Sequence, residues 1–176
     1  MNAAESLLGA AALARFGARI ALIAETESVS FADLSGRAAR AAGAFAQLGV
    51  RHGDRVLLLM RDTPAFAAAW LGAVRAGAVA VALNSKLSEA EYRHILGDSD
   101  AKLVVVEDVF CAARPDLTAE LAAAKRIAAS GAGASGLPRW EDALAGAAVP
   151  APFDAAPKLS AFIRRNSAGP ESTPQR

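Results

Sequence analysis

The segment Gly53–Leu83 reads GDRVLLLMRDTPAFAAAWLGAVRAGAVAVAL and decides the fold. Val56–Met60 and Val79–Leu83 are continuous apolar runs, which are typical of parallel strands buried on both faces. Between them, Thr63 and Pro64 suit the N-cap and the first position of a helix. The segment therefore predicts a strand, a helix and a second strand, joined by a right-handed crossover.

The residues before this segment predict a small N-terminal layer. Ser30 and Asp33 have the spacing of a capping box, so we expect them to begin a helix that Gly49 ends. Three further elements are predicted before that helix, in the order helix, strand and strand: Ala3–Phe16, Ile20–Ala24 and Ser28–Phe31.

The residues after this segment continue the alternation of strands and helices. Ser88 and Glu91 form a second capping box, and Leu103–Val106 is a third buried strand. Weaker patterns predict a helix, a strand and a helical turn: Leu117–Lys125, Arg126–Ala129 and Trp140–Leu144. The fold class is α/β, a doubly wound, mostly parallel sheet with helices on both faces. We expect one domain over residues 1–145. The Ala/Pro-rich composition of 146–176 predicts a linker and a disordered tail.

Composition excludes several functional classes. Hydrophobic residues make up 53% of the chain and the net charge is +1, so a packed core is expected and nucleic-acid binding is not. The single Cys111 allows no intramolecular disulfide and predicts a buried thiol in a reducing cytoplasm. Residues 65–83 carry one charge, Arg75, which costs about 2.5–3.5 kcal/mol at the centre of a membrane. No membrane association is expected.

Residues Gly131–Gly136, GAGASG, match the G-x-G-x-x-G pattern of dinucleotide-binding turns. Pro138 follows at once and prevents a helix from continuing through the last glycine, which favours a surface loop. A nucleotide-binding loop stays open as an alternative. The remaining polar candidates predict no metal site and no catalytic group, and are interpreted as solvated, packing or helix-end residues: His52, His94, Glu89, Glu91, Asp98 and Asp100.

Six segments, taken together and in order, resemble the N-terminal part of the adenylate-forming acyl- and aryl-CoA ligases. The first of them is similar to the start of the benzoate-CoA ligase branch. The resemblance extends over Asn2–Ala161 and rests on Asn2–Gly9, VSFADL (Val29–Leu34), LGVRHGDRVLLLM (Leu48–Met60), DTPAF (Asp62–Phe66), WLGAVRAGAVAVALN (Trp70–Asn84) and EYRHILGDSDAKLVVVE (Glu91–Glu107).

This resemblance implies a parent reaction in which ATP and Mg²⁺ activate a carboxylate to an acyl-adenylate, whose acyl group then passes to CoA. The family's phosphate loop, roughly [ST]-S-G-[ST]-T-G-x-P-K, is degenerate in this chain. Its remnant is Ser167, Gly169, Ser172 and Thr173. Pro170 and Glu171 intrude where backbone N–H groups should face phosphate, and the lysine is missing. No catalytic, cofactor-binding or metal-binding residue is carried over. Whether this chain is an enzyme stays open.

Three functional hypotheses remain. The first is a truncated aryl-CoA ligase, cut at the phosphate loop, with no adenylation and no cofactor of its own. The second is an interaction module that docks on, or completes, a separate ligase chain. The third is a nucleotide-binding protein that uses residues 131–136. Truncation would leave apolar surface exposed, so we expect contacts with a second copy or with a separate ligase chain.

Overall fold

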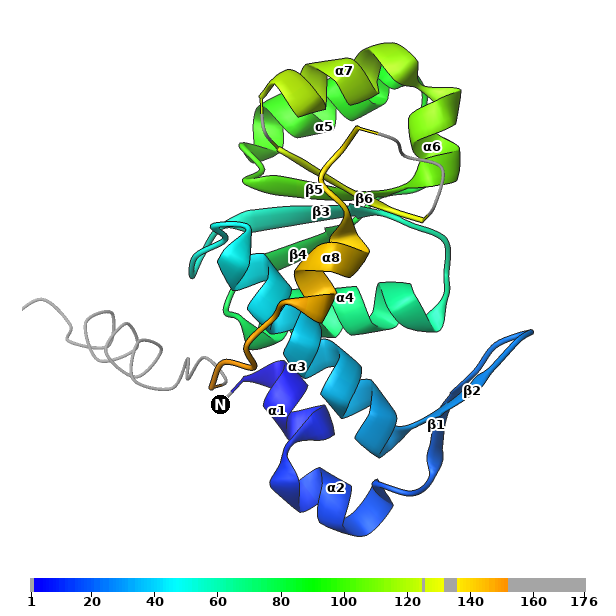
Figure 1. The fold of residues 1–176 in the computed structure, drawn as a ribbon, viewed down its shortest axis with the longest axis vertical. Helices are drawn as coiled ribbons and strands as arrows, with labels where there is room; N and C mark the ends of the chain where they lie inside the picture. The colour runs from blue at the N-terminus through cyan, green and yellow to red at the C-terminus, as the bar shows by residue number, and fades with distance from the viewer. Residues whose placement is uncertain (1, 125, 132–135, 152–176) are drawn as a thin grey trace, which may run out of the picture.

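A four-stranded parallel sheet forms the centre of the computed structural model, which describes residues 2–124, 126–131 and 136–151 (Figure 1). The strands lie in the order β4-β3-β5-β6. Their bounds are Arg55–Leu59 (β3), Val79–Ala82 (β4), Leu103–Glu107 (β5) and Ile127–Ser130 (β6). Val56 pairs with Ala80 on one side and with Leu103 on the other, so β3 lies inside the sheet.

Three helices cover one face of the sheet: α3 (Phe31–Gln47), α4 (Pro64–Arg75) and α8 (Trp140–Ala145). Leu58 and Val105 point into this layer and contribute to a core cluster with Phe45 and Trp140. The rings of Phe45 and Trp140 lie 4.8 Å apart between centroids, so α8 is fixed on α3 by an aromatic contact.

Three other helices cover the opposite face: α5 (Glu89–Ser99), α6 (Asp108–Ala113) and α7 (Pro115–Ala123). Leu57 and Val104 point into this second layer, where Tyr92 and Leu121 pack against them. Alternate residues of each inner strand therefore enter opposite cores, as a doubly wound sheet requires. The predicted fold class is confirmed. Helix α6 was not predicted, because it follows β5 directly and no side chain caps its start.

The N-terminal layer packs below α3 and α4 and holds the antiparallel hairpin β1 (Ile20–Ile23) and β2 (Ser28–Ser30). The prediction of one helix over Ala3–Phe16 was wrong. Two short helices, α1 (Ala3–Leu8) and α2 (Ala10–Phe16), meet at Gly9, whose backbone is extended. Glycine favours such a break because it loses more conformational entropy in a helix than other residues do.

Side chains at the predicted helix starts confirm two of the three capping predictions. The Thr63 hydroxyl accepts a hydrogen bond from the Phe66 N–H, and Pro64 begins α4. Ser88 and Glu91 form the complete capping box of α5. At α3, Ser30 accepts from the Asp33 N–H, while the Asp33 carboxylate accepts from the Ser30 hydroxyl rather than closing the predicted box.

The prediction that β4 is buried on both faces was wrong. β4 is the outer strand of the sheet, and the side chains at its two ends, Val79 and Ala82, are exposed. Its apolar sequence predicted a strand but carried no information on its place in the sheet order. That place is set by the crossover through α5, which returns the chain to the far side of β3.

Two further predictions concern membrane spans and the C-terminal segment. Within the described residues, no helix is long and apolar enough to cross a membrane. Ala147 packs against the core, and the Ala148 carbonyl lies directly over Gly43 of α3. The predicted disordered tail falls almost wholly on residues 152–176, outside the described ranges.

Candidate functional site at the carboxyl edge of the sheet

The carboxyl ends of β3 and β5 form the topological switch point of the sheet. The helix after β3 goes to one face, and the helices after β5 go to the other. Ligands of open α/β sheets bind in the crevice outside such a point. Arg61 follows β3, Glu107 ends β5, and Ser130 ends β6, so these residues mark the candidate site.

An ion pair closes the switch point. The Arg61 Nε donates to Glu107 Oε2 at 2.7 Å. The Glu107 side chain is only 10% exposed, whereas that of Arg61 is 66% exposed. The hydrogen bond and charge of Glu107 raise the pKa of Arg61. The pair therefore neutralises a carboxylate that the fold has removed from water.

The end of β6 approaches the same point. Gly131 has a φ of +106°, which L side chains rarely adopt, and an added Cβ would lie 2.5 Å from Cγ of the Asp108 side chain, so glycine is strongly favoured at this position. Glu141 joins α8 to the end of β6. Its Oε1 accepts from the Ser130 hydroxyl at 2.9 Å and from the Gly131 N–H at 3.0 Å. Three elements therefore meet here. Gly131 at the end of β6 lies beside Asp108 of α6, and Glu141 holds α8 to the same point.

Charged side chains of this edge pair with one another. Glu107, Asp108 and Glu141 carry three negative charges, and two guanidinium groups lie beside them: Arg61 on Glu107, and Arg139, whose Nη2 is 3.8 Å from Glu141 Oε2. A triphosphate needs cations and N–H donors, and at this edge Arg61, Arg139 and the Gly131 N–H already face carboxylates. The described residues also contain no group of three or more His, Cys, Asp and Glu placed to hold a metal ion.

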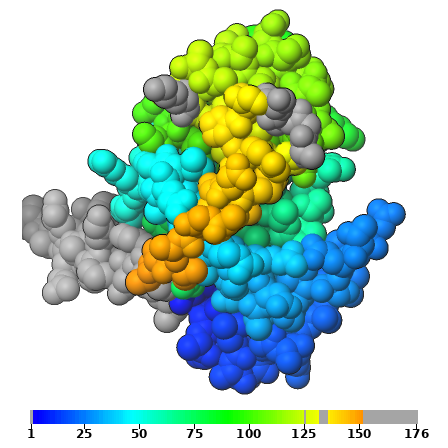
Figure 2. Space-filling model, in the orientation of Figure 1, coloured from blue at the N-terminus to red at the C-terminus, as the bar shows by residue number. Residues whose placement is uncertain are grey.

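Two open grooves flank the edge. One, of about 310 Å³, lies between α3, α4 and α8, with Arg37 and Arg40 on its rim and Trp140 in its wall. The other, of about 680 Å³, separates the hairpin turn from the start of α4. Figure 2 shows the hairpin projecting from the body of the molecule and the α8 segment crossing its front. Arg37 is held by a bidentate ion pair with Glu27, which lowers the pKa of that carboxyl.

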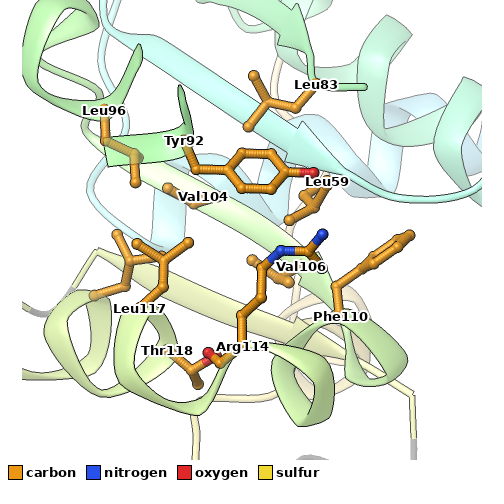
Figure 3. A pocket seen from close by; sticks show the side chains of 11 residues that line it. Leu59, Leu83, Tyr92, Leu96, Val104, Val106, Phe110, Arg114, Leu117 and Thr118 are labelled. Carbon is orange, nitrogen blue, oxygen red and sulfur yellow. The ribbon is translucent and has the colours of Figure 1, made fainter. Parts of the chain in front are cut away.

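The apolar hollow between the sheet and α5, α6 and α7 is too small for a ligand. Its volume is about 10 Å³, roughly the space of one water molecule. Arg114 closes it, with its guanidinium 4.9 Å from the Tyr92 ring and 5.9 Å from the Phe110 ring (Figure 3). The Tyr92 hydroxyl donates to the Asn84 carbonyl at 2.6 Å. The hollow is therefore part of the packed core, and the Arg114 guanidinium covers it through cation–π contacts.

The polar residues singled out in the sequence lie apart from the candidate site. Glu91 caps α5, Glu89 pairs with Arg93, and Asp100 is the left-handed C-cap of α5, where it pairs with Arg55. The interpretation of these carboxylates as helix-end charges is confirmed. His52 lies in an exposed turn, and His94 and Asp98 lie on the exposed surface of α5. Cys111 is buried as predicted, and burial raises the pKa of its thiol.

The two phosphate-loop candidates are only partly described. Of Gly131–Gly136, the structure describes the first and last glycines, and residues 132–135 lie outside it. The remnant Ser167, Gly169, Ser172 and Thr173 lies wholly outside the described residues.

Sequence reasoning missed the residues that meet at the switch point, namely Arg61, Glu107, Asp108 and Glu141. The available signal was positional. The first polar residues after buried parallel strands gather at one edge of the sheet. Arg61 and Asp62 follow one predicted strand, and Glu107 and Asp108 follow another.

Comparisons with known proteins support one family. The sequence model described as "AMP-binding enzyme" matches residues 10–160. A 3-hydroxybenzoate–CoA ligase of Aromatoleum sp. (strain CIB) is 35% identical over 132 residues, which cover 75% of this chain and 25% of that protein. A benzoate–CoA ligase of Thauera aromatica is 36% identical over 106 residues, or 60% of this chain and 20% of that one.

A solved structure agrees with these relatives. The crystal structure of a benzoate CoA ligase from Burkholderia xenovorans LB400 superimposes with a TM-score of 0.74 at 30% identity. The match covers 88% of this chain and 30% of that one. The chain thus aligns to the N-terminal region of AMP-forming CoA ligases and spans about a quarter of the length of the curated relatives it matches.

Proposed function

The chain belongs to the AMP-binding enzyme family, and from this premise we propose that it supplies the N-terminal scaffold of an AMP-forming aryl-CoA ligase without forming an acyl-adenylate itself. The observation that carries the proposal is the match of 88% of the chain to a benzoate CoA ligase structure. The parent reaction converts a carboxylate, ATP and CoA to acyl-CoA, AMP and pyrophosphate. ATP, Mg²⁺ and CoA belong to that parent reaction, and the cytoplasm, where they occur, is the location this proposal implies.

The candidate site supports the absence of independent adenylation. Adenylation builds negative charge on pyrophosphate, which cations and N–H donors must offset. At the carboxyl edge, the Arg61 guanidinium is already held by Glu107, and the Gly131 N–H by Glu141. The loop remnant at Ser167, Gly169, Ser172 and Thr173 lacks the family's lysine, so we propose that it binds no phosphate.

The same proposal divides the chain at about residue 145. Residues 1–145 form the scaffold, and residues 146–176 serve as a linker and tail. The Gln47 side chain donates to the Gly146 carbonyl, and the Ala148 carbonyl lies over Gly43, so the chain leaves the scaffold along α3.

Carboxylate-dependent exchange of pyrophosphate into ATP tests the absence of activity. We expect the purified chain to give no exchange above the blank with benzoate or 3-hydroxybenzoate and Mg²⁺. A full-length benzoate–CoA ligase measured in parallel is the positive control. Exchange that depends on both the chain and the carboxylate would overturn this part of the proposal.

A chimera tests the scaffold role separately. Residues 1–151 would replace the matching N-terminal region of the Thauera aromatica benzoate–CoA ligase. We expect benzoyl-CoA formation to be recovered in part, because the fold that supports the remaining domains is retained. The control chimera carries Leu58→Asp in the buried centre of β3 and should be inactive. A folded but inactive first chimera would contradict the scaffold role.

Exposed apolar residues favour a second candidate, an interaction module that completes a separate ligase chain. Ile23 is 83% exposed at the end of β1, and Ile20 and Leu7 are also exposed. The test mixes the chain with a benzoate–CoA ligase that lacks its N-terminal quarter. Co-elution with recovered exchange activity would support this role. Separate elution at high concentration would remove it.

A further inference from the structure

The groove between the hairpin turn and the start of α4 is lined by more acidic than basic side chains. Glu25 and Glu27 line it from the hairpin, and Arg61 and Asp62 line it from the turn before α4. Glu27 and Arg61 are held in the ion pairs described above. Among the described residues, the carboxylates of Glu25 and Asp62 have no ion-pair partner. One unpaired carboxylate on each wall is therefore available to a cation.

The same groove has an apolar lining. Leu22 and Ile23 contribute to it from β1, and Phe66 contributes from α4. Ile23 is 83% exposed, because the hairpin projects from the body of the molecule and no described segment covers this side chain (Figure 2). A groove of about 680 Å³ with apolar walls and two unpaired carboxylates suits a peptide that combines apolar and basic residues.

One segment of this chain, outside the described ranges, has that composition. Residues 158–165 read KLSAFIRR and contain three basic side chains and no acidic one. Over the whole chain, by contrast, basic and acidic residues are nearly equal in number, 19 against 18. Leu159, Phe162 and Ile163 add three apolar side chains to the same segment. Its charge and its apolar content therefore both complement the groove.

The chain between the scaffold and this segment is long enough to reach the groove. The Ala148 carbonyl lies over Gly43 of α3. Phe31, which follows the hairpin directly, begins α3 twelve residues before Gly43, or about 18 Å away along the helix. Fourteen residues separate Phe162 from Ala148, and an extended chain of that length spans at most about 46 Å. The segment can therefore reach the hairpin with length to spare.

We propose that residues 158–165 occupy the groove of the same chain. The two arginines of the segment pair with Glu25 and Asp62, and its apolar side chains cover Ile23. The groove borders the candidate site, because Arg61 lines the groove and also closes the switch point. The bound segment therefore covers one side of that site. The proposal goes beyond the scaffold role and does not depend on it.

Disulfide trapping in the full chain tests where the segment lies. Ile163→Cys is combined with Ala24→Cys in the groove or, as a control, with Val109→Cys on α6, which is 49% exposed. Both carry Cys111→Ser, so that no native thiol competes. At low protein concentration, we expect the groove pair to close within one chain at least about tenfold faster than the control pair, because docking raises the effective concentration of one thiol at the other.

Two results of this experiment would overturn the proposal. Equal rates for the groove pair and the control pair would mean that the segment does not favour the groove. Disulfides that form mainly between two chains, and that disappear on dilution, would mean that the segment of a second copy occupies the groove.

Trypsin cleavage tests the ion pairs without added cysteines. Trypsin cuts after arginine, so docking should slow cleavage after Arg164 and Arg165. The double variant Glu25→Gln, Asp62→Asn keeps this cleavage site, and Asp98→Asn on the exposed surface of α5 is the matched control. We expect cleavage to be about two- to tenfold faster in the double variant and unchanged in the control, with the same circular dichroism in all. An unchanged rate in the double variant would overturn the proposal.

Discussion

Strands β4 and β5 contain similar residues but have different surroundings. β5 is Leu-Val-Val-Val-Glu and all five residues are buried, whereas β4 is Val-Ala-Val-Ala and its two end residues are exposed. β5 has a neighbouring strand on each side and helices on both faces, while β4 has one neighbour. An apolar run therefore predicts that a segment joins a parallel sheet. Burial depends on the position that the crossovers give to that segment.

The largest expected contrast lies between the centre and the edge of the sheet. Leu58 of β3 is fully buried, so Leu58→Ala should lower the free energy of unfolding by about 2–5 kcal/mol. Val79→Ala at the edge should change it by no more than about 0.5 kcal/mol. Urea denaturation followed by circular dichroism measures both under conditions where the chain is monomeric. Equal losses for the two variants would show that β4 is covered in solution.

A smaller contrast compares two glycines in the helices that cover the sheet. Gly72 of α4 touches α3, and an added Cβ would lie 2.5 Å from Cβ of Ala41 and 2.9 Å from the Ala38 carbonyl oxygen. Gly72→Ala should therefore lower the free energy of unfolding by about 1–3 kcal/mol. At Gly97 of α5 an added Cβ meets nothing within 4 Å, so Gly97→Ala should raise it by about 0.4–1 kcal/mol. Thermal unfolding distinguishes the two signs, and a stable Gly72→Ala variant would mean that α3 and α4 can separate.

Much of the fold could be predicted because its signals are local. Thr63 with Pro64, and Ser88 with Glu91, mark helix starts by their own hydrogen bonds. The sheet order has no such signal, which is why β4 was expected to be buried. The candidate site has none either, because Arg61 and Glu107 meet across 46 positions of sequence. Their pairing follows only after β3 and β5 are placed side by side.

Acid should weaken one helix cap and two ion pairs at the surface. Hydrogen bonds from Ser88 lower the pKa of Glu91 from its ordinary value of 4.5. A lowered pKa means that this carboxylate stabilises the fold at pH values above 4.5, and that the contribution is lost as the pH falls through the lowered pKa. Glu27 and Glu120, whose pKa values are lowered by Arg37 and Arg93, act in the same direction.

Glu91→Gln isolates the contribution of one cap, since glutamine can still accept the capping hydrogen bond but does not titrate in this range. We expect wild type to be slightly more stable than Glu91→Gln at neutral pH, and the two to converge as the pH falls below 4.5. Urea midpoints measured across that range test this. A stability difference that grows in acid would contradict the expected direction.

Val79→Cys should have the smallest effect on stability. Labelling its thiol measures the difference between the centre and the edge of the sheet most directly. Cys111 lies beneath the covered face of β5, and burial raises the pKa of its thiol, so few thiolates are exposed to react at neutral pH. Val79→Cys places a second thiol at a half-exposed position of β4 with little cost to the fold. In the monomer we expect the added thiol to react at a rate close to that of the unfolded chain, and Cys111 to react only as the protein opens.

Slow labelling of the added thiol at high concentration, relieved by dilution, would show the edge being covered by a second copy. Rapid labelling of Cys111 in native buffer would instead mean that α6 and α7 open readily, and that the face of β5 is less well protected than its packing indicates.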